Sequence, residues 1–336
     1  MNEPKTVARV GEFALIDAIR RHFPPAPEDE IWSGDDAAVL KPSPGATVFT
    51  TDALVESVDF DLAYSPPGSV GFKAIAVNAS DVAAMGGHPR RAVATLALPA
   101  STPIDIVDGI AQGLARGCIE MGVDLVGGDL SGASEISLTV AMLGNVENAP
   151  VTRNGASPGD LICVTGTLGG AAGGLLLLRA RIASPEVEDG APSLSRLVGR
   201  QLEPTPRLKE GAVIGSLGAT AMIDVSDGLL ADLEHVLDAS GTGCRLDPAT
   251  VPVDPDLAAL EKVLAPDPLD LALTGGEDFE LLFTIAPDRE GQFREALDEL
   301  GTQATVIKEI TASERKVGDR NLEEWSMKGW QHLHNP

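Results

Sequence analysis

Six short acidic motifs recur along the chain, and each sets a carboxylate beside small or hydroxyl-bearing residues. They are Gly34-Asp35-Asp36, Thr50-Thr51-Asp52, Asn78-Ala79-Ser80-Asp81, Gly127-Gly128-Asp129, Asp224-Val225-Ser226-Asp227-Gly228 and Gly275-Gly276-Glu277-Asp278. A carboxylate of this kind, following an apolar strand, is poorly placed for packing and well placed for a hard cation. Magnesium prefers oxygen ligands from a few carboxylates, waters and substrate phosphates. Together the motifs predict one site that holds several metal ions and a polyphosphate substrate.

Each motif taken alone also has a simpler interpretation. Asp-Gly clusters are common in turns. Ser226 or Asp227 could cap the helix predicted to follow them. Asp81 lies in an apolar setting on a predicted helix and needs a partner there, which Lys73 could supply instead of a metal. The metal interpretation is favoured because six such motifs are spread over both halves of the chain.

Strands and helices alternate along the chain, and this pattern predicts the elements that carry the motifs. In the first half we expect helices at 12–23, 69–86 and 103–121, and strands at 31–40, 46–52, 91–98, 123–127 and 136–146. In the second half we expect strands at 161–165, 220–225, 243–247, 279–285 and 303–310, and helices up to 182 and at 194–202, 206–217, 228–239, 255–264, 268–273 and 288–300. The mixture predicts an α/β (α+β) fold of two domains, residues 1–150 and 151–336.

Composition narrows the class of protein. The 336 residues include 25 Lys and Arg against 50 Asp and Glu, a net charge of −25. No basic face is therefore expected for nucleic acid or an anionic membrane. Apolar stretches are interrupted well before the roughly 18 residues that a transmembrane helix needs. The three cysteines have no metal-ligand spacing and are expected to be buried free thiols, which suits a cytoplasmic protein.

Several familiar catalytic and nucleotide-binding signatures are missing from the sequence. No Gly-Lys-Ser/Thr run marks a Walker A loop, and the glycines at 166–174 do not form the dinucleotide fingerprint. Close packing of a helix on a strand explains those glycines better. An acidic protein that binds ATP must offset about four negative charges of the nucleotide, which bridging metal ions can do. Arg153 is the best candidate for a phosphate contact, although it could equally be a surface arginine.

The motifs, in this order, resemble the thiamine-monophosphate kinase family of the aminoimidazole-ribonucleotide-synthetase-like superfamily. The resemblance covers nearly the whole chain. It rests on Gly11-Glu12-Phe13, the first five acidic motifs with the run from Lys73 to Gly86, Arg153-Asn154-Gly155-Ala156, the run from Gly275 to Leu281, and Lys328-Gly329-Trp330.

The resemblance implies ATP-dependent phosphorylation of thiamine monophosphate to thiamine diphosphate by a homodimer whose N-terminal domains pair. The C-terminal domain would complete the ATP and substrate site. The implied Mg²⁺ ligands are Asp36, Thr50, Thr51, Asp52, Asp81, Asp129, Asp224 and Asp227. ATP contacts would come from Gly128, Asp129, Arg153 and Ser226, and substrate contacts from Glu277 and Trp330. A ring stacked on the cationic thiazolium is physically sensible, although Trp330 alone could be a packing residue.

One position departs from the family pattern. Where the family often has Glu-Gly-Val-His-Phe, this chain has Glu56-Ser57-Val58-Asp59-Phe60. A carboxylate that would repel a phosphate replaces an imidazole that could meet one. Asp59 is therefore retained as a candidate substrate position whose effect is open.

The expected mechanism is direct in-line transfer, because the acceptor phosphate oxygen is already ionised and needs no strong base. Catalysis would then come from positioning and charge neutralisation, chiefly by Asp36, Asp52, Asp129 and Asp227. Two alternatives remain: another ATP-dependent enzyme of the superfamily, acting on formylglycinamidine ribonucleotide or selenide, and a Mg-nucleotide-binding protein without turnover. The first cysteine, Cys118, lies far from the N-terminus where a selenide-using enzyme would need one.

Overall fold

The computed structural model describes residues 6–33, 37–42, 44–183, 192–325 and 329. The chain divides into two compact units. The first contains residues 1–82 and 88–147, and the second contains 83–87 and 148–336. The second unit thus includes the short segment Ala83–Gly87, which a division at residue 150 would leave with the first.

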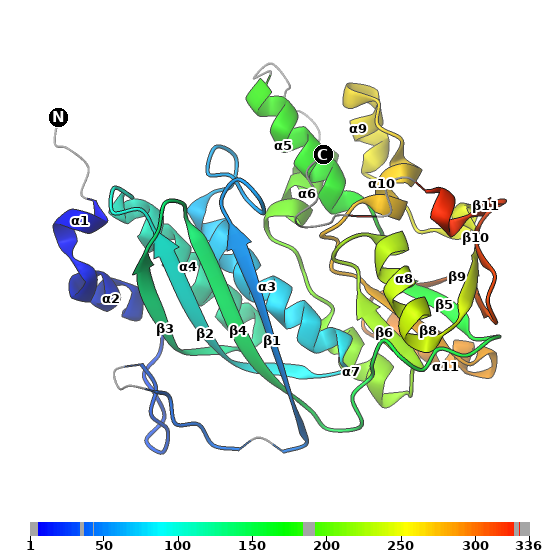
Figure 1. The fold of residues 1–336 in the computed structure, drawn as a ribbon, viewed down its shortest axis with the longest axis horizontal. Coiled ribbons are helices and arrows are strands. Elements are labelled where there is room, and N and C mark those ends of the chain that lie inside the picture. The colour runs from blue at the N-terminus through cyan, green and yellow to red at the C-terminus, as the bar shows by residue number, and fades with distance from the viewer. Residues whose placement is uncertain (1–5, 34–36, 43, 184–191, 326–328, 330–336) are drawn as a thin grey trace. The chain divides into compact units, whose positions relative to one another are not determined.

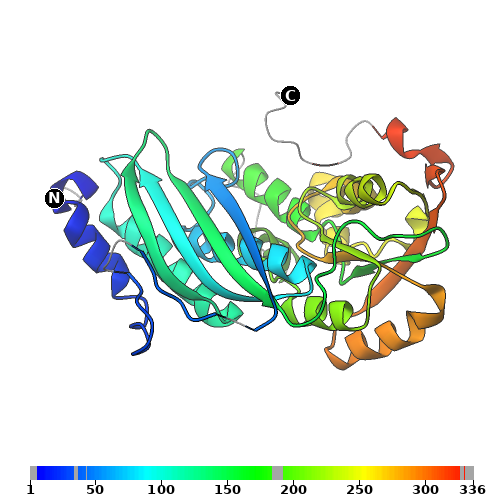
Figure 2. The same cartoon turned by 60° about the horizontal axis from the view of Figure 1, so that its bottom comes forward.

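The first unit is a four-stranded sheet with two long helices on one face (Figures 1 and 2). Its strands are β1 (Ala46–Val55), β2 (His88–Leu98), β3 (Asp124–Gly132) and β4 (Ser137–Val146), in the order β1-β4-β2-β3. The helices are α1 (Val7–Val10), α2 (Glu12–Arg20), α3 (Pro67–Ala84) and α4 (Ile104–Met121). Strand β4 pairs antiparallel with β1 and β2, whereas β2 and β3 are parallel.

Buried and exposed side chains alternate along the strands and show which face of the sheet the helices cover. Leu138, Val140 and Met142 of β4 are fully buried, and they share a face with Gly144, whose added Cβ would meet Val82 of α3. By the same alternation, the exposed side chains of Phe49 and Val93 lie on the opposite face, and none of the described helices covers that face (Figure 2). Strands β1 and β3 are the sheet's two edges. Within the described residues, the sheet of the first unit therefore has an unpaired edge on each side and one bare face.

Helices α3 and α4 approach each other closely at glycines. A Cβ added to Gly113 of α4 would overlap the backbone of Gly68 of α3, and one added to Gly71 would overlap the carbonyl of Ile110. A methyl group at these positions has no room, so the glycines fix the distance between the two helices and hence the position of α3 against the sheet.

The second unit is a seven-stranded sheet in the order β11-β10-β7-β9-β5-β8-β6. The strands are β5 (Leu161–Thr165), β6 (Ala221–Asp224), β7 (Gly243–Leu246), β8 (Leu281–Ile285), β9 (Ala304–Thr311), β10 (Arg315–Val317) and β11 (Arg320–Asn321). The helices are α5 (Gly170–Ala183), α6 (Pro192–Leu202), α7 (Leu208–Ser216), α8 (Leu229–Ser240), α9 (Leu257–Leu264), α10 (Pro268–Thr274) and α11 (Glu290–Glu299).

Two apolar clusters lie on the two faces of this sheet. Residues of α8 and α10 pack on one face with Ile162, Val164 and Leu282, and residues of α7 and α11 pack on the other with Cys163 and Phe283. A third cluster joins α5, α6 and α9. The central strands are thus covered on both sides, which is why they read as continuous apolar runs.

The expected mixed α/β fold of two domains is confirmed, but the strand expected at 31–40 is wrong. Ile31 and Val39 pair with each other through two backbone hydrogen bonds, so the segment turns back on itself and forms only an isolated bridge. Strands β10 and β11 were not expected, because both are very short.

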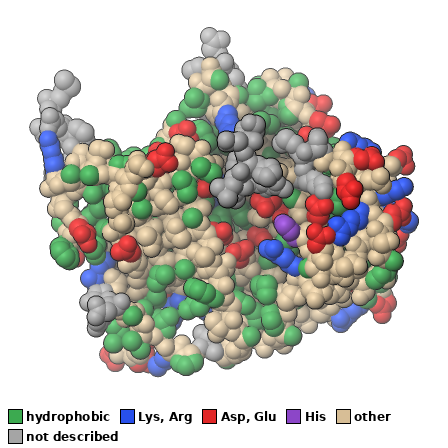
Figure 3. Space-filling model, viewed as in Figure 1, with side chains coloured by type: hydrophobic (Ala, Val, Ile, Leu, Met, Phe, Trp, Pro, Cys, Tyr) green, Lys and Arg blue, Asp and Glu red, His purple; other side chains and the backbone are tan. Residues whose placement is uncertain are grey.

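The cysteines and the glycine-rich segment can be compared with expectation. The three cysteines are buried and free, as expected. The glycines at 166–174 serve close packing, but the contact at Gly174 is between helices and not between a helix and a strand, since a Cβ on Gly174 of α5 would overlap the backbone of Leu197 in α6. No helix in the described part of the chain is long and apolar enough to cross a membrane. Acidic side chains are spread over the face seen in Figure 3, with Lys and Arg interspersed among them.

Candidate functional site

Three of the predicted metal-binding residues meet where β1 lies against α3. The Thr50 hydroxyl donates to the Asp81 carboxylate, and the backbone N–H of Asp52 donates to Asn78 Oδ1 at 3.1 Å. Asn78 is fully buried and is itself held by a 2.9 Å hydrogen bond from its Nδ2 to the Ala74 carbonyl. Thr50 and Asp52 share a face because side chains alternate along a strand. The first unit thus brings together the Thr50 hydroxyl and the Asp81 carboxylate, with Asp52 on the same face of β1, and these side chains carry oxygen donors that suit Mg²⁺.

Thr51 lies on the other face of β1. Its hydroxyl donates to the Val140 carbonyl at 2.9 Å, and its side chain is exposed. The alternation that brings Thr50 and Asp52 together therefore separates the Thr51 side chain from them. As a predicted metal ligand, Thr51 would have to contribute either through its backbone carbonyl or on the bare face of the sheet.

Asp129 lies on β3, at the opposite edge of the sheet from Asp52. The pairing aligns Asp52 with Val140, Ala94 and Gly128 across the sheet. Two strands intervene, and at about 4.8 Å per strand spacing the edges are about 14 Å apart. Asp129 is exposed, on the same face as Thr51. Asp52 and Asp129 of a single chain therefore cannot bind the same ion.

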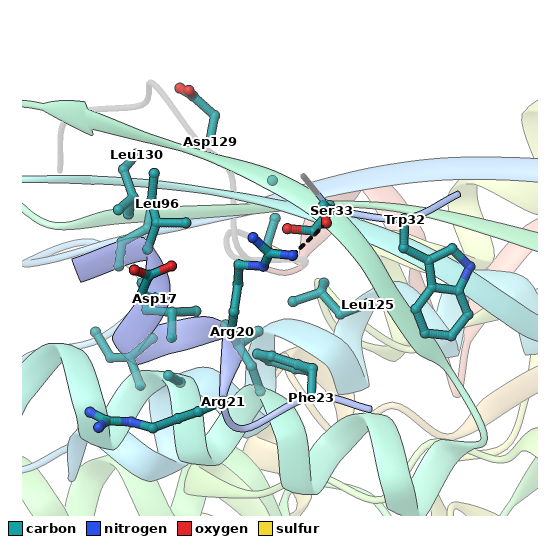
Figure 4. A pocket seen from close by; sticks show the side chains of 18 of the residues that line it. Asp17, Arg20, Arg21, Phe23, Trp32, Ser33, Leu96, Leu125, Asp129 and Leu130 are labelled. Atoms are coloured by element: carbon teal, nitrogen blue, oxygen red, sulfur yellow. Dashed lines mark hydrogen bonds between the residues drawn. The ribbon is translucent and has the colours of Figure 1, made fainter. Parts of the chain in front are cut away.

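A cavity of about 740 Å³ lies between the sheet and helices α2 and α4 of the first unit. Its apolar lining includes Phe23, Leu96, Ala111 and Leu114, and two predicted ATP contacts, Gly128 and Asp129, also border it. Figure 4 shows Leu96 and Leu130 on the cavity side of the sheet and Asp129 directed away from them.

Arg20 stands at this cavity and donates to the Ser33 carbonyl at 2.7 Å (Figure 4). Trp32, also in the lining, is anchored by a 2.8 Å hydrogen bond from its indole N–H to Glu30. Arg91 lies over the Trp32 ring at 5.7 Å and pairs with Glu30 and Asp124. These contacts fix the cavity wall just before the Gly34-Asp35-Asp36 motif.

Asp59 closes the turn that follows β1. Its Oδ2 accepts a 2.8 Å hydrogen bond from the N–H of Val55, and its own N–H donates to the Val55 carbonyl at 2.9 Å. Ser57 in this turn has a φ of 69°, a left-handed conformation. The carboxylate therefore has a local structural role here, whatever it contributes to a substrate.

The Asp224–Gly228 loop of the second unit links the end of β6 to α8. The residue that precedes α8 is Gly228, so neither Ser226 nor Asp227 occupies the N-cap position. The loop amides are bound instead by Asp232, four residues into the helix. Its Oδ2 accepts from the N–H groups of Ser226, Asp227 and Gly228 at 3.0, 3.1 and 3.1 Å.

Burial raises the pKa of Asp232 well above its usual range, with help from the charges of Asp224 and Asp227, while the backbone donors act against that rise. Sequence analysis did not single out Asp232. The one feature of the sequence that could have pointed to Asp232 is an acidic residue in the first turn of a helix that follows an acidic loop. Acidic residues are common at this place in helices, including those where they bind no loop amides.

Glu277 lies beside this loop in a strained conformation. Its φ is 68°, and its N–H donates to the Ser226 carbonyl at 2.8 Å. The amide nitrogen of Gln201, in α6, donates to the Glu277 carboxylate. Gln201 is only 4% exposed, and its Oε1 has no hydrogen-bond partner among the described residues. Left-handed non-glycine residues of this kind cluster at functional sites.

The second carboxylate of this motif has a different role. Asp278 accepts hydrogen bonds from the N–H of Gly169 at 2.6 Å and of Ala171 at 3.0 Å, which caps the start of α5. Burial raises the pKa of Asp278 to about 7, against the effect of these two donors. Asp278 is therefore a structural carboxylate.

Arg153 is exposed, and its carbonyl accepts from the Ser240 hydroxyl at the C-terminal end of α8. The Asp227 loop is at the other end of that helix, which is about 18 Å long by its 12 residues. Asp36 and Trp330 lie outside the described residues. Gly329, however, is described, and a Cβ on it would overlap the Asp227 carbonyl, so this part of the Lys-Gly-Trp motif lies on the loop.

Among the described residues of this one chain, no group of three or more His, Cys, Asp or Glu side chains is close enough to hold a metal. The candidate carboxylates are divided between two edges of one sheet and between two units. The predicted site residues therefore stay predictions, with Thr50, Asp52 and Asp81 gathered at one place and Asp224 and Asp227 on one short loop.

Comparison with known proteins agrees with the motifs. Residues 34–146 match the model of the N-terminal domain of AIR synthase related proteins, and residues 157–320 match that of the C-terminal domain. A thiamine-monophosphate kinase of Mycobacterium tuberculosis is 35% identical, covering 99% of this chain and 95% of its own. That of Escherichia coli K12 is 34% identical, covering 97% and 99%.

Solved structures give the same result. The thiamine-monophosphate kinase of Stenotrophomonas maltophilia superposes with a TM-score of 0.79 at 35% identity, covering 91% of this chain and 96% of that one. A structure described as "AaThiL complexed with AMPPCP and TMP" has a TM-score of 0.78 at 33% identity, covering 99% and 100%. The hydrogenase maturation protein HypE of E. coli, at 21% identity and a TM-score of 0.71, shares the fold alone.

Proposed function

The chain belongs to the AIR synthase related family, and within it to the thiamine-monophosphate kinases, and we propose on that premise that it transfers the γ-phosphoryl group of ATP to thiamine monophosphate. The product would be thiamine diphosphate. The observation that carries this proposal is the meeting of Thr50, Asp52 and Asp81 between β1 and α3, at positions that the family resemblance assigns to Mg²⁺.

ATP as co-substrate is supported by the relative solved with AMPPCP, an ATP analogue. The cavity of the first unit is the best place for the adenine and ribose. It is large enough for a nucleoside, has an apolar lining, and reaches Gly128 and Asp129, the predicted ATP contacts. The phosphates would then extend toward the edge of β3.

The donor set fits Mg²⁺, because Thr50, Asp52 and Asp81 offer only oxygen ligands. Bound Mg²⁺ would neutralise the charge of the phosphates during transfer. The chain's part is to hold the carboxylates in fixed positions, with Asn78 tying β1 to α3. No strong base is needed, since the acceptor is an ionised phosphate, so we propose in-line transfer without a phosphorylated enzyme.

We propose that the enzyme is a homodimer whose first units pair. The sheet has two free edges and a bare face with exposed Phe49 and Val93. A two-fold pairing of β1 with the partner's β3 would close eight strands into a barrel and remove both edges. The same pairing would place β1 of one subunit, which carries Asp52, directly beside the partner's β3, two strands that a single chain holds at opposite edges.

Thiamine monophosphate would be bound by Glu277 and Trp330, with Asp59 as a further candidate. Glu277 has the strained backbone expected of a binding residue and a dedicated hydrogen-bond donor in Gln201. A carboxylate suits the cationic thiazolium. The buried thiols suit a reducing compartment, and we propose that the enzyme acts in the cytoplasm.

The experiment that tests this function is a product assay with ATP, Mg²⁺ and thiamine monophosphate, with free thiamine as a parallel acceptor. We expect thiamine diphosphate from the monophosphate only, and complete loss of activity when the divalent ions are chelated. Asp52→Asn should lower turnover by orders of magnitude in a folded protein. Asp319→Asn, at an exposed turn, is the matched control and should keep full activity.

The assay also separates the alternatives. Nucleotide binding that depends on Mg²⁺ but gives no product from thiamine monophosphate would favour a binding protein, or a superfamily enzyme with another acceptor. In that case Asp59→His, which restores the residue that the family often has, is the next variant. Activity gained in Asp59→His would show that the carboxylate alone blocks the substrate.

A further inference from the structure

Asp232 occupies a place where an anionic ligand would be expected. It lies in the first turns of α8, and helical side chains point back toward the N-terminus. Its side chain therefore reaches the preceding loop, where one oxygen accepts from three consecutive amides at 3.0–3.1 Å. The residue is 1% exposed.

Three consecutive N–H groups that converge on one point form an anion-binding nest, and a helix N-terminus adds to its positive potential. Phosphate groups commonly bind at such places. From the sequence, the loop at 224–228 would offer both its amides to phosphate and its carboxylates to metal. In the structure the chain's own carboxylate fills the nest.

Two carbonyls of the loop also accept hydrogen bonds from the chain. The Val225 carbonyl accepts from Phe279 N–H at 2.9 Å, and the Ser226 carbonyl accepts from Glu277 N–H at 2.8 Å. The Asp227 carbonyl lies against Gly329. The amides of residues 226–228 and the carbonyls of Val225 and Ser226 are therefore engaged within the chain.

We propose that Asp232 is a positioning residue that fills the anion nest of residues 226–228, so that the loop engages Mg²⁺ and nucleotide through its side chains and not phosphate through its amides. The metal-binding part of this inference rests on the proposed function, whereas the filling of the nest does not. An internal carboxylate makes the loop rigid before any ligand arrives, and it keeps phosphate from binding there in the wrong mode.

The test compares Asp232→Ala, which empties the nest, with Asp232→Asn, which keeps an acceptor oxygen and the side-chain shape. Asp238→Asn is the control, since Asp238 is an acidic residue of the same helix that pairs with Arg315 at the far end. Hydrogen exchange of peptides covering 224–232 reports on the loop amides without requiring activity. Binding of Mn²⁺ and kcat/KM for thiamine monophosphate are measured on the same full-length proteins.

In Asp232→Ala we expect amide exchange at 226–228 at least tenfold faster, with a comparable fall in kcat/KM and Mn²⁺ affinity. Formate should restore part of the amide protection and part of kcat/KM, because a small carboxylate can bind in the emptied nest. Inorganic phosphate should slow exchange of these amides in Asp232→Ala and not in the wild type. Asp232→Asn should lie between the wild type and Asp232→Ala, and Asp238→Asn should match the wild type.

Three results would overturn the inference. One is unchanged exchange in Asp232→Ala, which would mean that the amides do not depend on this carboxylate. Another is phosphate protection of the loop amides in the wild type, which would make the nest a phosphate site. The third is Asp232→Asn behaving as badly as Asp232→Ala while the rest of the protein stays folded. Loss of loop protection with no kinase activity in any form, wild type included, would contradict the proposed function alone.

Discussion

Glu277 combines a left-handed backbone with a buried hydrogen-bond donor, and both features constrain its carboxylate. We predict that Gln201→Leu raises KM for thiamine monophosphate about tenfold or more, because a hydrogen bond to a charged group contributes about 1.5–3 kcal/mol. KM for ATP should change much less. Steady-state kinetics, with each substrate varied in turn, measures the change in each of the two KM values.

Arg196→Gln is the matched control for Gln201. Arg196 lies on the same helix, with a side chain 60% exposed that pairs with Asp256, and it should leave both KM values unchanged. Equal increases in both KM values for Gln201→Leu would indicate general damage to α6 and contradict a specific role in holding Glu277.

Asp278 gives a pH-dependent contribution to stability. Its pKa is raised to about 7 in the folded protein by burial, from 3.8 when exposed. Between these values the folded state holds a proton that the unfolded state has lost, so stability must fall as pH rises, by at most about 1.4 kcal/mol per pH unit. The stability that the folded protein gains from keeping Asp278 protonated is fully present below about pH 4 and is gone above pH 7.

We therefore predict that the free energy of unfolding of the wild type, relative to Asp278→Asn, declines between pH 5 and pH 7. Urea unfolding of both proteins at several pH values measures the difference, in which contributions from the other carboxylates cancel. A difference that grows with pH would show that the two backbone N–H donors outweigh burial and lower the pKa of Asp278.

At the level of elements, the crossing of α3 and α4 decides where Asp81 lies. Gly113→Ala should destabilise the first unit by about 1–3 kcal/mol, because its methyl group meets the backbone of Gly68. Separating the helices should also shift α3 along the sheet and weaken Mg²⁺-dependent activity. Thermal unfolding and Mg²⁺ titrations of activity report the two effects.

Gly199→Ala is the control, since Gly199 is helical and its added Cβ meets nothing within 4 Å. It should be neutral or slightly stabilising, as alanine favours helix. A Gly113→Ala protein as stable as Gly199→Ala would mean that the helices separate at no cost, and that the close approach is not what places α3.

For the whole molecule, the separation of Asp52 from Asp129 leads to a test of the proposed dimer. Asp52→Asn and Asp129→Asn should each be inactive alone. Mixed and allowed to exchange subunits, they should recover up to about a quarter of the wild-type activity, because half of the dimers are mixed and each mixed dimer has one intact composite site. Activity before and after exchange measures this.

Native mass spectrometry confirms that mixed dimers have formed, and two portions of Asp52→Asn mixed together serve as the control. Mixed dimers without recovered activity would show that the two carboxylates act within one chain or at separate sites. A monomer at micromolar concentration, with activity intact, would contradict the dimer itself.

The sequence determined the chemistry because the residue types and their local order carry it. Carboxylates beside glycine, serine and threonine, placed after apolar strands, predicted oxygen-ligated metals. The alternation of strand and helix patterns predicted a mixed α/β fold, and the long helices and central strands lie where their apolar periodicity indicated. For these elements the local pattern is informative, since the spacing of apolar residues within each element determines which of its faces is buried. The strand predicted at 31–40 is wrong because Ile31 pairs with Val39 of the same segment, and no local pattern in the sequence shows this pairing.

Only the tertiary structure decided how these residues are grouped. Alternation on β1 sends Thr51 away from Thr50 and Asp52, and the strand order puts Asp129 at the opposite edge. Ser226 or Asp227 could have capped the helix that starts after residue 228, yet the carboxylate of Asp232, four residues further along, accepts from the N–H of Gly228 instead. Asp278, next to Glu277 in sequence, caps α5 instead. Motif spacing records position along the chain, whereas these distinctions depend on strand pairing, side-chain direction and long-range hydrogen bonds, which exist only once the chain has folded.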